Sequence, residues 1–72
     1  MTKEEFVKQY EQMMLEGDSC ITVYVSMPEL PEFEEITNTQ PNYEKKLEYY
    51  KNAYDDNMCL KAKPDIRIVE VI

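Results

Sequence analysis

The chain has 72 residues, a formal net charge of -7 at pH 7 and no histidine. A chain of this length folds as one domain, residues 1–72, whose thin core buries only about 60% of the unfolded surface. Without histidine or a C-x-x-C spacing a zinc site is not expected, and most hydrolase, transferase and nucleotide-binding mechanisms lack their usual motifs. We therefore expect a protein that is not an enzyme and that uses no cofactor and no metal.

The two cysteines, Cys20 and Cys59, are far apart in the sequence. Unpaired cysteine usually packs as a small hydrophobic side chain, so both are expected as reduced thiols in the core. No basic and apolar signal segment opens the chain, and no apolar run approaches the roughly 20 residues of a membrane span. The expected location is the cytoplasm, with no membrane contact.

The first predicted element is a helix that begins at Thr2-Lys3-Glu4-Glu5, a capping-box sequence. Gly17 lies where a left-handed cap would end this helix. The apolar stripe of the helix recurs at steps of three and four residues. It consists of Phe6, Val7, Tyr10, Met13 and Met14.

The second predicted element is a strand over residues 21–26, which ends at Met27-Pro28. Ile21, Val23 and Val25 fall on one face of this strand, as in a half-buried sheet. The following segment, residues 28–41, contains three prolines and four glutamates. Within it, residues 33–37 form either a short edge strand or part of a loop.

A second helix is predicted to open at Pro41 or Asn42. Its apolar face consists of Tyr43, Leu47, Tyr50 and Tyr54, and Tyr49 lies off this face near solvent. The last element is a strand over residues 66–72. Its alternation is imperfect, which indicates either two partly covered faces or a bulge that shifts the register.

These elements predict an α/β fold, with α+β as the alternative, in the order helix, strand, optional edge strand, helix and strand. Two helices would cover a sheet of two or three strands. A strand, a helical crossover and a second strand form a βαβ unit, which predicts that the two strands are parallel. Such a small sheet has open edges, and a homodimer would cover one of them.

No basic residue occurs between Lys8 and Lys45, although eight acidic residues do. Affinity for nucleic acid comes mainly from Lys and Arg, so direct binding to nucleic acid is not expected. A basic surface on a partner protein is the natural complement of this interval. The D-x-D-x-D-G loop that wraps calcium is missing.

Three segments carry a resemblance to small phage and prophage proteins of low-GC Gram-positive bacteria. They begin with Ile21-Thr22-Val23-Tyr24-Val25-Ser26, Lys46-Leu47-Glu48-Tyr49-Tyr50 and Leu60-Lys61-Ala62-Lys63-Pro64. The resemblance implies a bacterial host cell as the setting and no particular activity. Small acidic phage proteins of the anti-CRISPR and DNA-mimic types occupy nucleic-acid-binding surfaces of host proteins.

The leading hypothesis is such an inhibitor, in which carboxylates stand in for phosphates and apolar side chains anchor the partner. One alternative is a self-assembling structural or accessory domain whose acidity serves solubility. Another is a regulatory domain that binds metal through the same carboxylates. The predicted partner-binding residues are Asp18, Glu29, Leu30, Glu32, Phe33, Glu34, Glu35, Glu44 and Tyr49.

Overall fold

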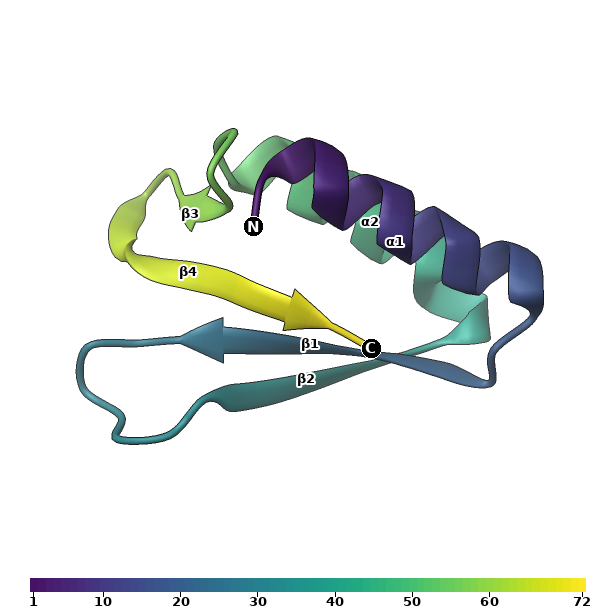
Figure 1. The fold of residues 1–72 in the computed structure, drawn as a ribbon, viewed down its shortest axis with the longest axis horizontal. Helices are drawn as coiled ribbons and strands as arrows, with labels where there is room; N and C mark the ends of the chain where they lie inside the picture. Colours follow the sequence, from purple (N-terminus) through teal and green to yellow (C-terminus); the bar gives the residue numbers. More distant parts are fainter.

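The computed structural model describes residues 1–72 as two helices packed on one face of a four-stranded sheet (Figure 1). The strand order is β2-β1-β4-β3, and each neighbouring pair is antiparallel. Helix α1 packs against β4 and helix α2 against β2. Both helices lie on the same face of the sheet, and the other face carries no helix. Neither helix combines the length and the apolar character that crossing a membrane requires. In chain order the elements are α1 (Lys3–Glu16), β1 (Cys20–Ser26), β2 (Glu34–Thr39), the 3-10 helix η1 (Gln40–Asn42), α2 (Tyr43–Ala53), β3 (Cys59–Leu60) and β4 (Lys63–Val71).

The predicted α/β class with a parallel βαβ unit is wrong, and the α+β alternative describes the chain. The reason is β2, which forms a hairpin with β1 in a continuous register from Cys20 opposite Thr39 to Val25 opposite Glu34. β2 therefore returns the chain to the start of β1 before α2 begins (Figure 1). Since α2 then carries the chain back to the other end, β4 has to run antiparallel to β1.

The predicted first strand is confirmed as β1, and its inner face is buried as expected at Ile21, Val23 and Val25. The edge strand that the sequence left open is formed. It spans Glu34–Thr39 instead of residues 33–37 and is the outermost strand on its side of the sheet.

The last strand is also confirmed, and the imperfect alternation is explained by a bulge. Val25 lies opposite Ile68 whereas Tyr24 lies opposite Glu70, so β4 carries one extra residue, Val69, at this point. The bulge lets Ile68 and Val71 both face the helices, where each is buried. β4 starts at Lys63, earlier than predicted, because it also pairs with β3.

Both ends of α1 have the predicted caps. Thr2 Oγ1 accepts a hydrogen bond from the Glu5 backbone N–H at 3.2 Å, and Glu5 Oε1 accepts one from the Thr2 N–H at 2.8 Å. Hydrogen bonding of the Glu5 carboxylate to the Thr2 backbone N–H, and also to the Thr2 side chain, lowers the pKa of Glu5. Gly17 adopts a φ of 73°, a left-handed conformation that strains other residues.

The core is aromatic and lies between the helices and the sheet. The predicted apolar face of α2 is buried, and Tyr49 is exposed as predicted. Edge-on ring contacts join the two helices, with 5.4 Å between the ring centroids of Phe6 and Tyr50 and 6.2 Å between those of Tyr10 and Tyr43. Such pairs add about 0.5–1.5 kcal/mol each beyond the area they bury.

The expectation that both cysteines belong to the core is wrong. Cys20 is exposed and Cys59 is half-buried, and both are free thiols. Cys20 opens β1 in the same phase as Thr22, so its side chain points away from the helices, opposite to Ile21. Alternation along the strand therefore decides its position.

Two core tyrosines differ in one respect that predicts opposite effects on stability. The Tyr50 hydroxyl donates to Asn38 Oδ1 at 3.4 Å, whereas the Tyr10 hydroxyl is buried without a partner, and burial raises the pKa of Tyr10. Tyr10→Phe should therefore raise the free energy of unfolding by up to about 1 kcal/mol, and Tyr50→Phe should lower it by about 1 kcal/mol. Urea unfolding followed by circular dichroism measures both; equal shifts of the same sign would contradict the assignment.

Candidate protein-binding site

The connection between β1 and β2, residues 27–33, presents two large apolar side chains to solvent. Leu30 is 46% exposed and Phe33 is 57% exposed. Single exposed apolar side chains are common, but two within four positions of one loop are suited to anchor a protein partner. We call residues 27–33 the anchor loop.

Local contacts give the anchor loop a defined shape. The Leu30 N–H donates to the Met27 carbonyl at 3.2 Å, which closes a turn. Lys63 Nζ on β4 donates to Glu29 Oε1 at 2.9 Å, and this bond lowers the pKa of Glu29. Both partners are exposed, so the ion pair positions the loop more than it stabilises the fold. The prolines in the loop further limit its freedom, which reduces the entropy lost on binding.

Glu35 stands on the face of the sheet that no helix covers. It lies opposite Tyr24 on β1, and Glu70 on β4 lies opposite Tyr24 on its other side. The pKa of Tyr24 is raised, mainly by the hydrogen-bonding interaction of its hydroxyl with the Glu35 carboxylate, and also by partial burial and the charge of Glu70. This tyrosine therefore stays neutral and separates two carboxylates.

Glu34 points to the helix side of the sheet, opposite Val25. The pKa of Tyr54 is raised to about 12, mainly by burial and to a smaller extent by the charges of Tyr49, Tyr50 and Glu34. The rings of Tyr49 and Tyr54 are 6.3 Å apart between centroids. The predicted site residues Glu34 and Tyr49 are thus both neighbours of Tyr54, at the border between α2 and β2.

Asp18 and Glu44 lie at the other end of the sheet. Asp18 precedes the seven residues of β1 and the anchor loop follows them. At about 3.3 Å per residue, β1 places roughly 20 Å between the two groups. The structure therefore keeps Glu29, Leu30, Glu32, Phe33, Glu34 and Glu35 at one end of the sheet, with the side chains of Glu34 and Glu35 on opposite faces, and it separates Asp18 and Glu44 from them.

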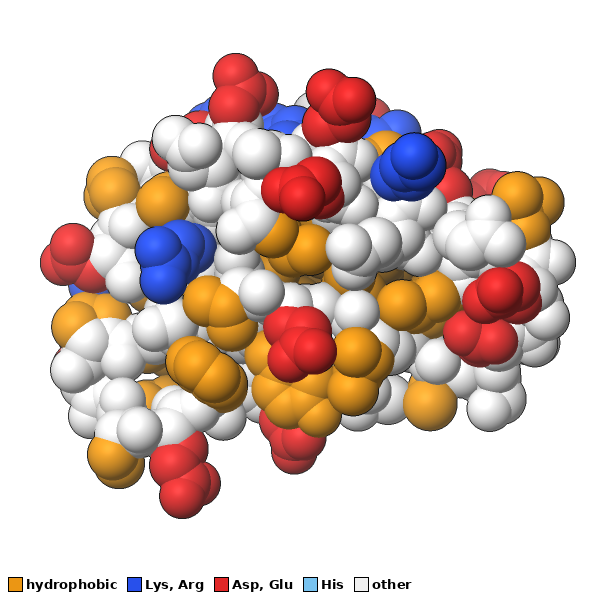
Figure 2. Space-filling view, viewed as in Figure 1, with side chains coloured by type: hydrophobic (Ala, Val, Ile, Leu, Met, Phe, Trp, Pro, Cys, Tyr) orange, Lys and Arg blue, Asp and Glu red, His pale blue; other side chains and the backbone are white.

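The acidic side chains also do not gather into one patch. Figure 2 shows them spread over the visible face, with Lys and Arg side chains between them. Residues 9–44 contain no basic residue, but in the folded chain Lys63 forms an ion pair with Glu29 of this interval. Two acidic residues, Glu29 and Glu32, lie within the anchor loop itself, and Glu34 and Glu35 follow it directly.

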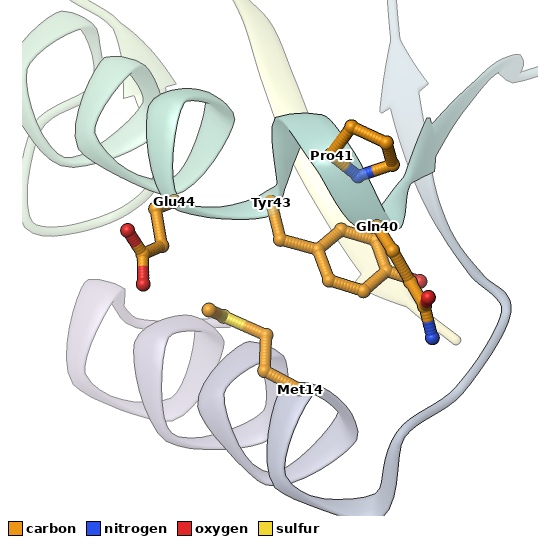
Figure 3. Close-up of a pocket in the computed structure, with 5 residues that line it drawn as sticks. All are labelled: Met14, Gln40, Pro41, Tyr43 and Glu44. Atoms are coloured by element: carbon orange, nitrogen blue, oxygen red, sulfur yellow. The ribbon is translucent and has the colours of Figure 1, made fainter.

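A hollow of about 390 Å³ lies at the end of the molecule that carries Asp18 and Glu44 (Figure 3). Two of its polar groups are already engaged, because Tyr43 Oη donates to the Asp18 carbonyl at 2.6 Å and Gln40 Nε2 donates to the same oxygen at 3.2 Å, which leaves the Glu44 carboxylate. Small-molecule sites need convergent polar groups that are available to a ligand. We therefore assign this hollow to the packing of α1 against η1. It is lined by Met14, Gln40, Pro41, Tyr43 and Glu44.

The sequence interpretation missed Leu15, which is 84% exposed on α1 and follows Met14, one of the residues that line this hollow. Leu15 lies outside the apolar stripe of α1, and this position in the sequence could have indicated an exposed side chain. No group of three or more His, Cys, Asp or Glu side chains is arranged to hold a metal ion.

Comparison of the chain with models of protein families, with curated proteins and with solved structures finds no match. Function has to be inferred from the surface itself.

Proposed function

We propose that this protein is a small, acidic, non-enzymatic binding protein that docks on a basic, nucleic-acid-binding surface of another protein. The observation that carries the proposal is the anchor loop, where Leu30 and Phe33 are exposed among Glu29, Glu32, Glu34 and Glu35. A loop with two apolar anchors and a rim of like charge has the composition of a recognition element.

The expected partner surface follows from these two components. Surfaces that bind single strands combine basic side chains with apolar or aromatic platforms on which bases stack. The carboxylates would occupy the positions of phosphates, and Phe33 would take the place of a base. Charge attraction would speed the encounter and make binding sensitive to salt, whereas the buried anchors would slow dissociation.

The resemblance to small phage and prophage proteins supports an inhibitor as the biological form of this activity, of the anti-CRISPR or another DNA-mimic type. The proposed contact residues are those of the anchor loop and the start of β2, with Tyr49 at the border. Asp18 and Glu44 are outside this surface because of their distance from it.

A pull-down from bacterial lysate tests the proposal. We expect the tagged protein to retain a nucleic-acid-binding protein at low salt and to release it when salt rises or when DNA or RNA is added. The double variant Leu30→Ala, Phe33→Ala should weaken retention at least about tenfold, since loss of two anchors costs more than about 1.4 kcal/mol. Mass spectrometry identifies the retained protein.

Two matched variants make this test specific. Leu15→Ala removes a more exposed apolar side chain at the other end of the molecule and should not change retention. Replacing Glu32, Glu34 and Glu35 by Gln should reduce retention, whereas replacing Glu4, Glu11 and Glu16 on α1 by Gln, which removes the same charge, should not. If the anchor variant binds like the wild type, or if only copies of the protein itself are captured, the proposal is wrong and self-assembly replaces it.

A further inference from the structure

The β2 side of the sheet ends in an open strand edge. β2 pairs only with β1, over six residues in a continuous register. The opposite side of the sheet ends in β3, which has two residues and an irregular register. Natural edge strands are usually protected by prolines, bulges, charged side chains or short length. β3 has such protection, whereas β2 contains no proline, no lysine and no bulge, and its only charged residues, Glu34 and Glu35, stand at one end of the strand.

The backbone groups at the open edge can be assigned from the neighbouring strand pair. Thr22 on β1 exchanges two hydrogen bonds with Ile72, at 2.7 and 2.9 Å, so its N–H and C=O point away from β2. In an antiparallel pair the bonded residues alternate, so β1 binds β2 through Ile21, Val23 and Val25. On β2, the residues in phase with Thr22 therefore direct their N–H and C=O groups outward. These residues are Glu35, Thr37 and Thr39.

We propose that this edge pairs with the same edge of a second copy of the chain, antiparallel, with Thr37 opposite Thr37 of the second copy. This register places Glu35 opposite Thr39 and Glu34 opposite Gln40, so no two carboxylates face each other directly. A parallel pairing in register would place Glu34 and Glu35 beside their own copies, where like charges are destabilising. Thr37 facing its own copy is a favourable cross-strand pair.

The helix layer contributes to the same interface. Glu44 lies beside Met14 of α1, and the Lys51 carbonyl accepts a bond from Lys3 Nζ, so these positions of α2 face α1. At 100° per residue, Lys46 and Tyr49 point to the opposite side, toward the β2 edge. Tyr49 is 48% exposed there, and Lys46 Nζ lies 5.4 Å from its ring centroid. A second copy would cover both side chains and add apolar contact to the strand pairing.

The assembly closes as a dimer of eight strands, because a twofold axis uses the β2 edge of both copies and β3 offers no equivalent edge. This inference goes beyond the proposed binding role and does not depend on it. In the dimer the second copy covers Tyr49, so the surface left for a partner protein is the anchor loop.

Sedimentation equilibrium of the purified protein tests the inference. The wild type should reach twice the mass of the chain as its concentration rises. Thr37→Pro removes an outward N–H that β1 does not use and should abolish the dimer. Thr37→Glu places four carboxylates around the axis and should weaken dimerisation several-fold at low salt, whereas a mixture of Thr37→Glu with Thr37→Lys should restore it.

Gln12→Glu, which adds the same charge on the exposed face of α1, is the matched control and should leave the dimer unchanged. Circular dichroism checks that each variant is folded; if Thr37→Pro is not, Thr37→Glu decides. A wild type that stays monomeric up to about 1 mM would overturn the inference. So would a folded Thr37→Glu variant that dimerises like the wild type.

Discussion

Replacing Phe6 by alanine is expected to unfold most of the protein or to bring it close to unfolding at room temperature. Phe6 is 0% exposed, and its ring lies 5.7 Å from that of Tyr10 and 5.4 Å from that of Tyr50, between centroids. Truncating a buried phenylalanine costs about 3–5 kcal/mol. A domain of this length has a total stability of about 4–11 kcal/mol. Urea unfolding at 25 °C measures the difference in the free energy of unfolding between Phe6→Ala and the wild type.

Leu15→Ala is the control for this substitution. This substitution also truncates a large apolar side chain of α1, but Leu15 is 84% exposed. The free energy of unfolding of the variant should therefore stay within about 0.5 kcal/mol of that of the wild type. If Phe6→Ala costs no more than Leu15→Ala, the aromatic contacts between the helices do not form the core described above.

Asn38→Asp is expected to destabilise the protein strongly at neutral pH. Asn38 is 3% exposed, its Nδ2 donates to the Ile21 carbonyl at 3.3 Å, and its Oδ1 accepts from Tyr50. A carboxylate at this position keeps the acceptor but replaces the donor by a charge that faces a carbonyl oxygen. Burying a charge without a partner costs about 3 kcal/mol or more.

The effect of Asn38→Asp should depend on pH with a defined sign. Burial raises the pKa of the introduced carboxyl in the folded state above its unfolded value of about 3.9. The difference in stability from the wild type should therefore be smallest below that value and should grow as pH rises through the folded-state pKa. Urea midpoints at about pH 4 and pH 7 test this. The exposed control Asn42→Asp should show no such growth, and equal pH dependence would contradict the buried position of Asn38.

Local elements followed from local chemistry. The capping box at Thr2 and Glu5, the left-handed cap at Gly17 and the periodicity of both helices use contacts between residues at most a few positions apart. The alternation of residues 21–26 was visible for the same reason. The edge strand stayed undecided, because Glu34 and Glu35 are unusual at the start of a strand and only pairing with Val25 and Tyr24 places them there.

The candidate site was predictable in its parts but not in its arrangement. Leu30, Phe33 and Tyr49 could be singled out from their positions outside the apolar faces of the helices and strands, and all three are exposed. The grouping of the carboxylates could not be predicted, because β1 separates Asp18 from Glu29 in space although both belong to one acidic interval. The ion pair of Glu29 with Lys63 also joins segments that are distant in the sequence.

The sequence by itself determined which segments are helices, the inner face of β1 and the overall charge, since capping, periodicity and composition act over a few residues. The tertiary structure decided the direction of β4, the exposure of Cys20 and the two separate groups of acidic residues. The direction of β4 depends on β2 pairing with β1, and that pairing is a sum of hydrogen bonds and side-chain contacts between strands. The exposure of Cys20 and the separation of the acidic residues depend on the path of β1 and on which of its faces the helices cover. Such contacts have no local signature, so the order of the strands, and with it the surface a partner would meet, exists only in the folded chain.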